Sequence, residues 1–209
     1  MNRLDGKVAF ISGAARGIGA ATARLMVEAG AKVAIGDVLD DRGRETARTI
    51  AGTVDTAMYQ HLDVTREEDW TAAIAATAAR FGGLDVLVNN AGLFLGKGVE
   101  EASIEEWHRL CAVNLTGVFL GTKHALPALR ERARQSPHGS AIVNLASVAG
   151  LVGSQLDPLY SMTKGGVTLF TKSTALEFAR KGYRVRVNSI HPGLIQTREA
   201  GKRVWCAVS

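Results

Sequence analysis

Tyr160 and Lys164 have the residue types and the spacing for proton transfer at an alcohol. They stand four positions apart, so on a helix their side chains lie on the same face. A tyrosine is a poor base at neutral pH because its pKa is about 10, but a nearby ammonium favours the phenolate and lowers that pKa. A lone Tyr-x-x-x-Lys on an amphipathic helix is more often surface than catalytic, so the pair needs support from other residues.

Ser147 is a candidate partner of Tyr160. It stands thirteen residues before Tyr160, at the end of an apolar run of strand length. Ligands of parallel α/β sheets bind at the carboxyl ends of the strands. We therefore expect Ser147 to hydrogen-bond the oxygen of the substrate.

A glycine-rich turn near the start of the chain indicates a phosphate-binding site. Gly13 follows a predicted strand, and Gly17 and Gly19 lie in the first turn of the helix predicted after it. Glycines let the backbone turn tightly and approach a diphosphate, and the N–H groups at the start of the helix face the anion. Many loops hold several glycines, so it is the strand before and the helix after that favour a dinucleotide.

Asp37 and Arg16 bear on which dinucleotide is bound. Asp37 closes the second predicted strand, 18 residues beyond Gly19, where an acid accepts hydrogen bonds from the adenosine ribose. The same charge would repel the 2′-phosphate of NADP, whereas Arg16 could neutralise it. We give Asp37 more weight and predict NAD, with NADP as the alternative.

These residues are set in a chain that alternates strand and helix patterns. Predicted strands, rich in Val, Ile and Ala, cover residues 8–12, 33–37, 57–62, 86–89, 141–145 and 185–190. Predicted helices cover residues 17–29, 41–51, 67–81, 104–110, 114–134 and 160–180. Two carry capping boxes, at Thr65 with Glu68 and at Ser103 with Glu106.

The alternation predicts an α/β fold with a doubly wound parallel sheet of about six strands and helices on both faces. Strands that are apolar on both faces suit a covered parallel sheet, and strand–helix–strand units form right-handed crossovers. No linker, repeat or low-complexity tract interrupts residues 1–209, so we expect a single domain.

Composition and residue spacing limit the kinds of partner, compartment and metal that we expect. The net charge of +5 could suggest an anionic partner, but no aromatic residues interleave with the basic clusters, so we expect no nucleic-acid binding. No apolar run reaches membrane-span length, and the start has no signal-peptide pattern. Two cysteines give no disulfide framework, which favours the cytoplasm. His191 has no partner at metal-ligand spacing, so we predict a structural histidine and no metal.

The chain resembles the short-chain dehydrogenase/reductase family from about residue 4 to residue 197. The motifs similar to the family's are the G-x-x-x-G-x-G turn, an N-N-A-G segment, an adenine-contacting pair, the Y-x-x-x-K signature with its upstream serine, an asparagine on the fifth helix and a P-G turn. In this sequence they are Gly13, Gly17 and Gly19; Asn89, Asn90, Ala91 and Gly92; Asp63 and Val64; Tyr160 and Lys164 with Ser147; Asn114; and Pro192 with Gly193.

The resemblance implies a Rossmann fold and a role for each of these residues. Tyr160 would be the general acid/base, Lys164 would also reach the nicotinamide ribose, and Asn114 would hold a water that links Lys164 to solvent. The cofactor-binding set implied is Gly13, Arg16, Gly17, Ile18, Gly19, Asp37, Asp63, Val64, Asn90, Ala91, Gly92, Tyr160, Lys164, Pro192, Gly193, Ile195 and Thr197.

The expected substrate is a hydrophobic secondary alcohol or ketone. In their residue pattern, the segments 63–70 and 186–192 are most similar to bacterial hydroxysteroid and secondary-alcohol dehydrogenases. The loops at 93–99 and 148–159 are mostly apolar, which disfavours a sugar phosphate or a carboxylate. A homo-oligomer, dimer or tetramer, is the family expectation.

The C-terminal end departs from the family pattern. Members continue past the P-G-x-x-x-T segment into a covering loop, a helix and a seventh strand, for which residues 198–209 are too short. The sixth strand is then an exposed edge, unless the tail supplies a strand of its own. Three hypotheses remain: an NAD-dependent dehydrogenase, a truncated and catalytically impaired nucleotide-binding remnant, and a non-enzymatic binding subunit.

Overall fold

The fold is built on a six-stranded parallel sheet. The computed structural model describes residues 4–199 and 202–206. The strands of the sheet lie in the order β3-β2-β1-β4-β5-β6, and each neighbouring pair is parallel. Their bounds are β1 Val8–Ser12, β2 Lys32–Asp37, β3 Ala57–His61, β4 Val86–Asn89, β5 Ser140–Leu145 and β6 Val185–Ile190.

Helices connect the strands as the sequence predicts, with small shifts at the ends. The α-helices are α1 Gly17–Glu28, α2 Asp40–Ala51, α3 Glu67–Phe81, α4 Ile104–Cys111, α5 Gly117–Gln135 and α6 Pro158–Arg180. Two shorter elements lie between them, the π-helix η1 Ala112–Thr116 and the 3₁₀-helix η2 Val148–Gly150. The prediction of a single helix over residues 114–134 missed the π-helical turn that precedes α5.

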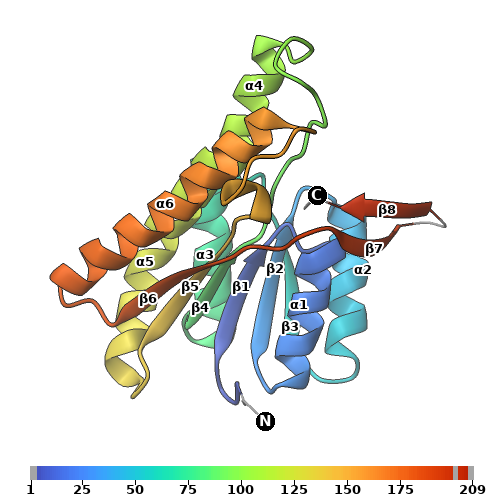
Figure 1. Ribbon diagram of the computed structural model, residues 1–209. Helices are drawn as coiled ribbons and strands as arrows, with labels where there is room; N and C mark the ends of the chain where they lie inside the picture. The colour runs from blue at the N-terminus through green and yellow to red at the C-terminus, as the bar shows by residue number, and fades with distance from the viewer. Residues whose placement is uncertain (1–3, 200–201, 207–209) are drawn as a thin grey trace.

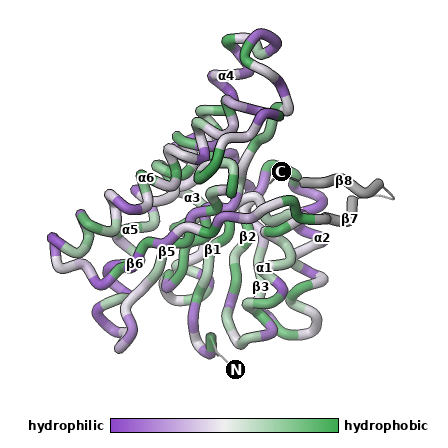
Figure 2. Tube along the Cα trace, in the orientation of Figure 1, coloured by the Kyte–Doolittle hydropathy of each residue, from purple (hydrophilic) through white to green (hydrophobic). Residues whose placement is uncertain are grey.

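The core lies on both faces of the sheet, because successive residues of a strand point to opposite sides. Val8 and Phe10 of β1 pack with α3, α5 and α6, whereas Ala9 and Ile11 pack with α1 and α2. Figure 1 shows α1 and α2 on one side of the sheet and α5 and α6 on the other. Hydrophobic residues follow the central strands, and the hydropathy of the helices is mixed (Figure 2). The doubly wound α/β prediction is therefore confirmed.

One of the two predicted capping boxes forms. Ser103 Oγ accepts from Glu106 N at 3.2 Å, and the Glu106 carboxylate accepts from Ser103 N at 2.9 Å. The box predicted at Thr65 is wrong, since α3 begins only at Glu67 and its N-cap residue is Arg66. Thr65 Oγ1 instead donates to Asp63 Oδ1 at 2.7 Å, because that carboxylate is a nearer and charged acceptor.

The segment after β6 forms a separate hairpin. Strands β7 Ile195–Glu199 and β8 Lys202–Cys206 pair antiparallel with each other, and β7 contacts α1. Figure 1 shows the chain after β6 leading across the sheet to this hairpin. Among the described strands, β6 has a neighbour on one side only. Within the described residues the edge of β6 thus stays open, as one of the two alternatives predicted, because the strands of the tail pair only with each other.

Candidate active site

The order of the strands reverses between β1 and β4, and this is where a doubly wound sheet opens a crevice for a ligand. The glycine turn after β1 and the segment after β4 meet there. Gly13 has a φ of 64°, and a Cβ added to it would lie 2.7 Å from the Cα of Ala91. A side chain at Gly19 would lie 2.5 Å from the carbonyl oxygen of Gly13. Only glycine permits the two segments to approach this closely.

Polar side chains join the same two segments. Ser12 Oγ accepts from the backbone N–H groups of Asn90 and Ala91, at 3.1 and 3.2 Å. Asn90 Nδ2 donates to the carbonyl oxygens of Ser12 and Gly13, at 2.9 and 2.8 Å. The role found for Asn90 is therefore to hold the glycine turn in place.

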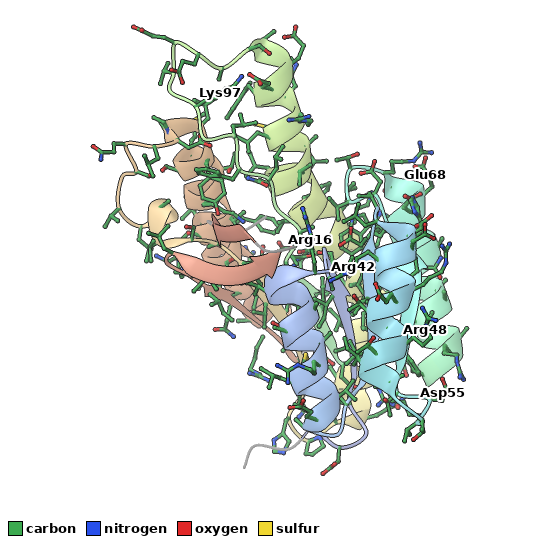
Figure 3. All side chains as sticks on the ribbon, turned by 90° about the vertical axis from the view of Figure 1, so that its right-hand side faces the viewer. Arg16, Arg42, Arg48, Asp55, Glu68 and Lys97 are labelled. Carbon is green, nitrogen blue, oxygen red and sulfur yellow. The ribbon has the colours of Figure 1, made fainter. Side chains whose placement is uncertain are left out.

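The amino end of α1 is suited to an anion. The N-cap residue Arg16 makes no side-chain cap bond to it, and its first turn, within the described residues, carries no acidic residue. The first N–H groups of a helix have no partner within the helix, and the helix dipole favours negative charge near them. Figure 3 shows Arg16 on the side of the molecule where α1 and α2 lie.

A cleft of about 280 Å³ opens beside the glycine turn. Seven residues of the predicted cofactor set line it: Gly13, Arg16, Asp37, Asp63, Val64, Ala91 and Gly92. Five residues that the sequence did not single out as cofactor-binding complete the wall: Val38, Leu39, Leu62, Leu93 and Val113. Apolar walls with two carboxylates suit the flat base and the hydroxyls of an adenosine, so these residues fit the dinucleotide.

Asp37 links the glycine turn to the end of β2. Its Oδ2 accepts from Ala15 N at 2.9 Å, and its Oδ1 accepts from Leu39 N at 3.1 Å. A carboxylate offers about four lone-pair sites, so two bonds leave acceptor capacity for a ligand in the cleft. Arg16 lines the same cleft, as the competing interpretation of the sequence requires.

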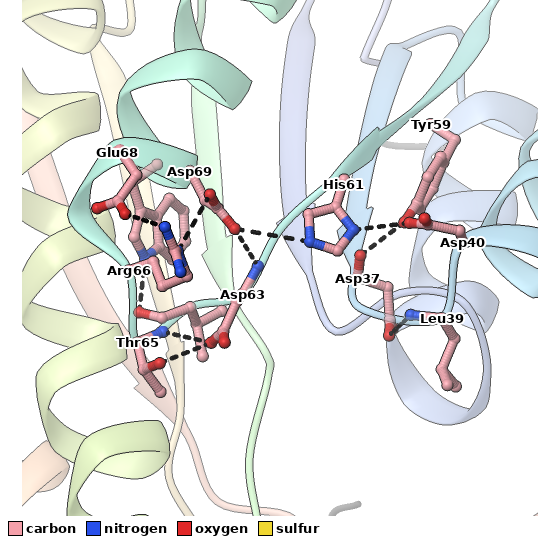
Figure 4. A network of polar contacts seen from close by, with 12 residues as sticks. Asp37, Leu39, Asp40, Tyr59, His61, Asp63, Thr65, Arg66, Glu68 and Asp69 are labelled. Atoms are coloured by element: carbon pink, nitrogen blue, oxygen red, sulfur yellow. Dashed lines mark hydrogen bonds and ion pairs between the residues drawn. The ribbon is translucent and has the colours of Figure 1, made fainter.

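A polar network supports the acidic wall of this cleft (Figure 4). His61 Nδ1 lies 2.7 Å from Asp40 Oδ1, and its Nε2 lies 3.7 Å from Asp69 Oδ2. Asp69 Oδ2 accepts from the backbone N–H of Asp63 at 2.9 Å. The hydrogen bond with Asp40 raises the pKa of His61, although burial opposes it. The network therefore joins α2, β3 and α3 behind the cleft.

Tyr160 and Lys164 are buried on α6, each 1% exposed. Lys164 Nζ lies 5.6 Å from the centroid of the Tyr160 ring and donates to the carbonyl oxygen of Leu145 at 2.7 Å. Burial lowers the pKa of Lys164 to about 8, because the charged form loses its water. The predicted placement of both side chains on one face of a helix is correct.

Ser147 follows β5 and is 3% exposed. Its Oγ accepts from Ala149 N at 3.1 Å, which leaves the hydroxyl proton to be donated elsewhere. His191 Nδ1 lies 3.1 Å from the carbonyl oxygen of Ser147, and its Nε2 lies 2.9 Å from Ser189 Oγ. His191 is thus a hydrogen-bonded structural residue, as predicted, and it holds the backbone at Ser147.

Asn114 lies within the π-helix η1 and is 1% exposed. Its Oδ1 accepts from Leu93 N at 2.7 Å, and its Nδ2 donates to Leu93 O at 2.9 Å and to Thr163 Oγ1 at 3.0 Å. The side chain therefore joins the segment after β4 to α6. The water relay through Asn114 stays a prediction.

Comparison with known proteins identifies the family to which the chain belongs. The short chain dehydrogenase family profile matches residues 7–204. The chain belongs to the short-chain dehydrogenase family. It is therefore an oxidoreductase of the kind that uses a nicotinamide cofactor and acts on small molecules.

Named relatives are dehydrogenases. A trans-4-hydroxycyclohexanecarboxylate dehydrogenase of Sinomonas cyclohexanicum is 46% identical over 94% of this chain and 75% of its own length. A 3-alpha-(or 20-beta)-hydroxysteroid dehydrogenase of Mycobacterium tuberculosis is 48% identical over 93% and 71%. An NADP-dependent (R)-specific alcohol dehydrogenase of Lentilactobacillus kefiri is 42% identical over 94% and 76%.

A solved structure shares the fold. The 3-ketoacyl-(acyl-carrier-protein) reductase of Brucella melitensis, complexed with NADH, superposes with a TM-score of 0.87 at 34% identity. The match covers 93% of this chain and 78% of the reductase.

A second pocket of this short-chain dehydrogenase, about 470 Å³, lies over Tyr160 and Ser147. Its other walls are mostly apolar or small: Phe94, Val148, Ala149, Val152, Gly153, Ser154, Gln155, Leu156, Gly193 and Leu194. It brings together the two loops that the sequence predicts to contact substrate, and none of the residues lining it is charged.

The remaining predicted cofactor residues of the short-chain dehydrogenase are spread over three elements. Ile18 of α1 is half-buried against the core, and Pro192 O accepts from Val148 N at 3.1 Å. Gly193 lines the second pocket, and Ile195 begins β7 with 38% exposure. Thr197 lies within β7, and its side chain is outside the described residues. Their contacts with a cofactor stay predictions.

Two other properties follow from the described part of the short-chain dehydrogenase. In the described part of the chain, no group of three His, Cys, Asp or Glu side chains could hold a metal ion. Within residues 4–199 and 202–206, every helix falls short of the length and apolarity that a bilayer span demands.

Proposed function

We propose that the protein transfers a hydride between NAD(H) and a hydrophobic secondary alcohol or ketone, with Tyr160 as general acid/base. The observation that carries the proposal is the apolar pocket lined by both Tyr160 and Ser147, with Lys164 buried beside the tyrosine ring. The dehydrogenase names of the relatives agree with this reaction class and favour it over a non-enzymatic binding subunit.

The residues of the chain would divide the proton chemistry among them. Ser147 Oγ donates to the substrate oxygen and orients it toward Tyr160. In oxidation, Tyr160 Oη takes the hydroxyl proton of the alcohol, and in reduction it returns that proton to the carbonyl oxygen. The Lys164 ammonium stabilises the phenolate in between. A bound nicotinamide cofactor supplies the hydride donor or acceptor.

NAD is the proposed cofactor, and Asp37 is the residue that selects it. Its carboxylate lines the cleft, where it would accept from both ribose hydroxyls and repel a 2′-phosphate. The NADH complex of the Brucella melitensis reductase supports this choice. Arg16 and the NADP-dependent relative from Lentilactobacillus kefiri favour the alternative, so the choice needs a direct test.

The substrate class follows from the walls of the second pocket. Because none of the residues lining it is charged, a substrate carboxylate or phosphate would have no ionic partner there. Cyclic and steroid-like alcohols match apolar walls of this kind, and the Mycobacterium tuberculosis relative is named for a hydroxysteroid. The Sinomonas cyclohexanicum relative is named for a cyclic alcohol that also bears a carboxylate.

The enzyme is further proposed to act as a homo-oligomer. Met162, Leu169 and Leu176 are 58%, 65% and 74% exposed and recur every seven residues on α6. This spacing forms the apolar seam with which one helix packs on another. A second copy of the chain, which presents the same seam, is the proposed occupant.

Replacing Tyr160 by phenylalanine tests the reaction. Tyr160→Phe should lower kcat by about 10²- to 10⁴-fold, because it removes the proton carrier and leaves the ring in place. The dissociation constant for NADH, measured by fluorescence, should stay within about twofold. Tyr183→Phe, in the turn between α6 and β6, is the matched control, and it should keep wild-type turnover. Retained turnover in Tyr160→Phe contradicts the assignment.

A further inference from the structure

Asp157 is a buried carboxylate that the proposed chemistry does not use. The residue is 0% exposed and caps α6, whose first residue is Pro158. Its Oδ1 accepts from the backbone N–H of Tyr160 at 2.8 Å. Its Oδ2 accepts from the backbone N–H groups of Leu95 and Gly96, both at 2.9 Å. One side chain thus joins the helix of Tyr160 to a segment about sixty residues earlier in the chain.

That segment has no helix or strand to hold it over the described residues 91–98. Asn114 holds it at Leu93, and Asp157 holds it at Leu95 and Gly96. Phe94 lies between the two attachment points. Its ring meets the ring of Tyr160 edge-on, with centroids 5.2 Å apart and an interplanar angle of 83°.

Capping α6 does not by itself require this carboxylate. A serine or threonine hydroxyl would accept the same bond from the start of the helix. A buried charge is costly unless hydrogen bonds compensate it, and here three backbone N–H groups do so. Two of the three belong to the segment that carries Phe94, so the second oxygen has a role beyond the cap.

We propose that Asp157 is a positioning residue that holds Phe94 against Tyr160 and thereby sets the width of the substrate pocket at the reacting oxygen. Both aromatic rings line that pocket, and Asp157 acts on them only through the backbone. This inference rests on the proposed function, because it takes Tyr160 as the acid/base. It identifies a residue that governs which alcohols are accepted.

Asp157→Ser separates the two halves of the contact. The serine hydroxyl can still cap α6 at Tyr160, but it is too short to reach Leu95 and Gly96. We expect kcat/KM for small secondary alcohols to fall about tenfold or more, since misplacing groups by about 1 Å can cost up to 10²-fold in rate. The preference between a bulky cyclic alcohol and a small acyclic one should shift toward the bulky one. KM for NAD⁺ should not change.

Two further variants serve as a control and as a milder change for comparison with Asp157→Ser. Ala175→Gly weakens the same helix roughly 22 Å from Tyr160 along its axis, so it should leave the preference between alcohols unchanged. Asp157→Asn keeps the size of the side chain and one acceptor oxygen, and it should give a smaller shift of the same sign. If Asp157→Ser does not fold, Asp157→Asn carries the comparison.

Amide hydrogen exchange, measured without substrate, tests the contact independently of turnover. In Asp157→Ser the amides of Leu95 and Gly96 should exchange about tenfold faster or more, and those in the middle of α6 should be unchanged. Unchanged exchange at Leu95 and Gly96 overturns the contact. Faster exchange with wild-type kcat/KM and preference overturns the positioning role. A wild-type chain without turnover would instead refute the proposed function, and the exchange result would still be interpretable.

Discussion

At the scale of single residues, Lys164 keeps a positive charge in the site although its burial destabilises the folded protein. Burial lowers its pKa from 10.5 to about 8, which corresponds to roughly 3 kcal/mol against the ammonium form. The penalty is present below pH 8 and is relieved as the pH rises from about 8 toward 10.5, because the folded state favours the neutral amine. The bond to Leu145 O offsets part of it. Such a cost is typical of a residue kept for chemistry.

The pKa of Lys164 predicts how kcat/KM changes at alkaline pH. In ketone reduction, Tyr160 must carry its proton and Lys164 its charge, so kcat/KM for NADH should fall as the pH rises through about 8. Steady-state rates between pH 6 and 10 measure this. Lys164→Arg keeps a permanent charge, so any residual activity should lose the part of that decline that comes from Lys164. A flat wild-type profile up to pH 10 contradicts the role of Lys164.

At the scale of elements, the sequence predicted the sheet well because its strands are apolar runs between clear breaks. The predicted bounds of β1, β4 and β6 match the observed ones, and Tyr160 and Lys164 lie on one helix as expected. The π-helix at Asn114 was missed, and so were the hydrogen bonds of Asn114 with Leu93 and Thr163, because these partners are distant in the chain. Asp157 was missed for the same reason, because backbone N–H partners leave no pattern in a sequence.

Asp37, which joins the end of β2 to the glycine turn, allows a further prediction about the choice between NAD and NADP. Asp37→Ser removes the charge that would repel a 2′-phosphate. The ratio of the NADPH to the NADH dissociation constant should fall about tenfold or more, equivalent to about 1.4 kcal/mol. Fluorescence titration with both cofactors measures it.

Asp41→Asn is the matched control for Asp37→Ser. Asp41 lies four residues further along, is exposed and pairs with Arg44, so its replacement removes the same charge without touching the cleft or the network behind it. An equal change in the ratio for both variants would mean that overall charge, and not Asp37, selects the cofactor.

At the scale of the whole molecule, the two faces of the sheet differ in how they are covered. Helices α3, α5 and α6 cover one face, whereas α1 and α2 lie on the other, where the buried cluster includes residues of β1, β2, β4 and β5. Arg186 and Asn188 of β6 are exposed, and Ile190 is 53% exposed. The outer surface of α6 adds the apolar seam of Met162, Leu169 and Leu176. The proposed homo-oligomer would cover the apolar seam.

Oligomeric state is therefore a prediction at this scale. Light scattering coupled to size exclusion should give a dimer or tetramer for the wild-type chain. Leu169→Glu should shift it to monomers while NADH still binds, because the cofactor cleft lies elsewhere. Leu25→Glu, at an exposed apolar position of α1, should leave the assembly intact. A monomeric wild type, or an unchanged Leu169→Glu oligomer, contradicts the seam.

Hydride transfer between NAD and a hydrophobic alcohol can be tested by following NADH itself. The purified chain is mixed with NAD⁺ and a series of hydrophobic secondary alcohols, cyclic and steroid-like ones included, and NADH formation is recorded. Matching ketones with NADH give the reverse reaction. The prediction is turnover that is faster with NAD⁺ than with NADP⁺ and is lost in Tyr160→Phe. NADH binding without turnover in either direction would contradict hydride transfer by this chain and favour the catalytically impaired nucleotide-binding protein.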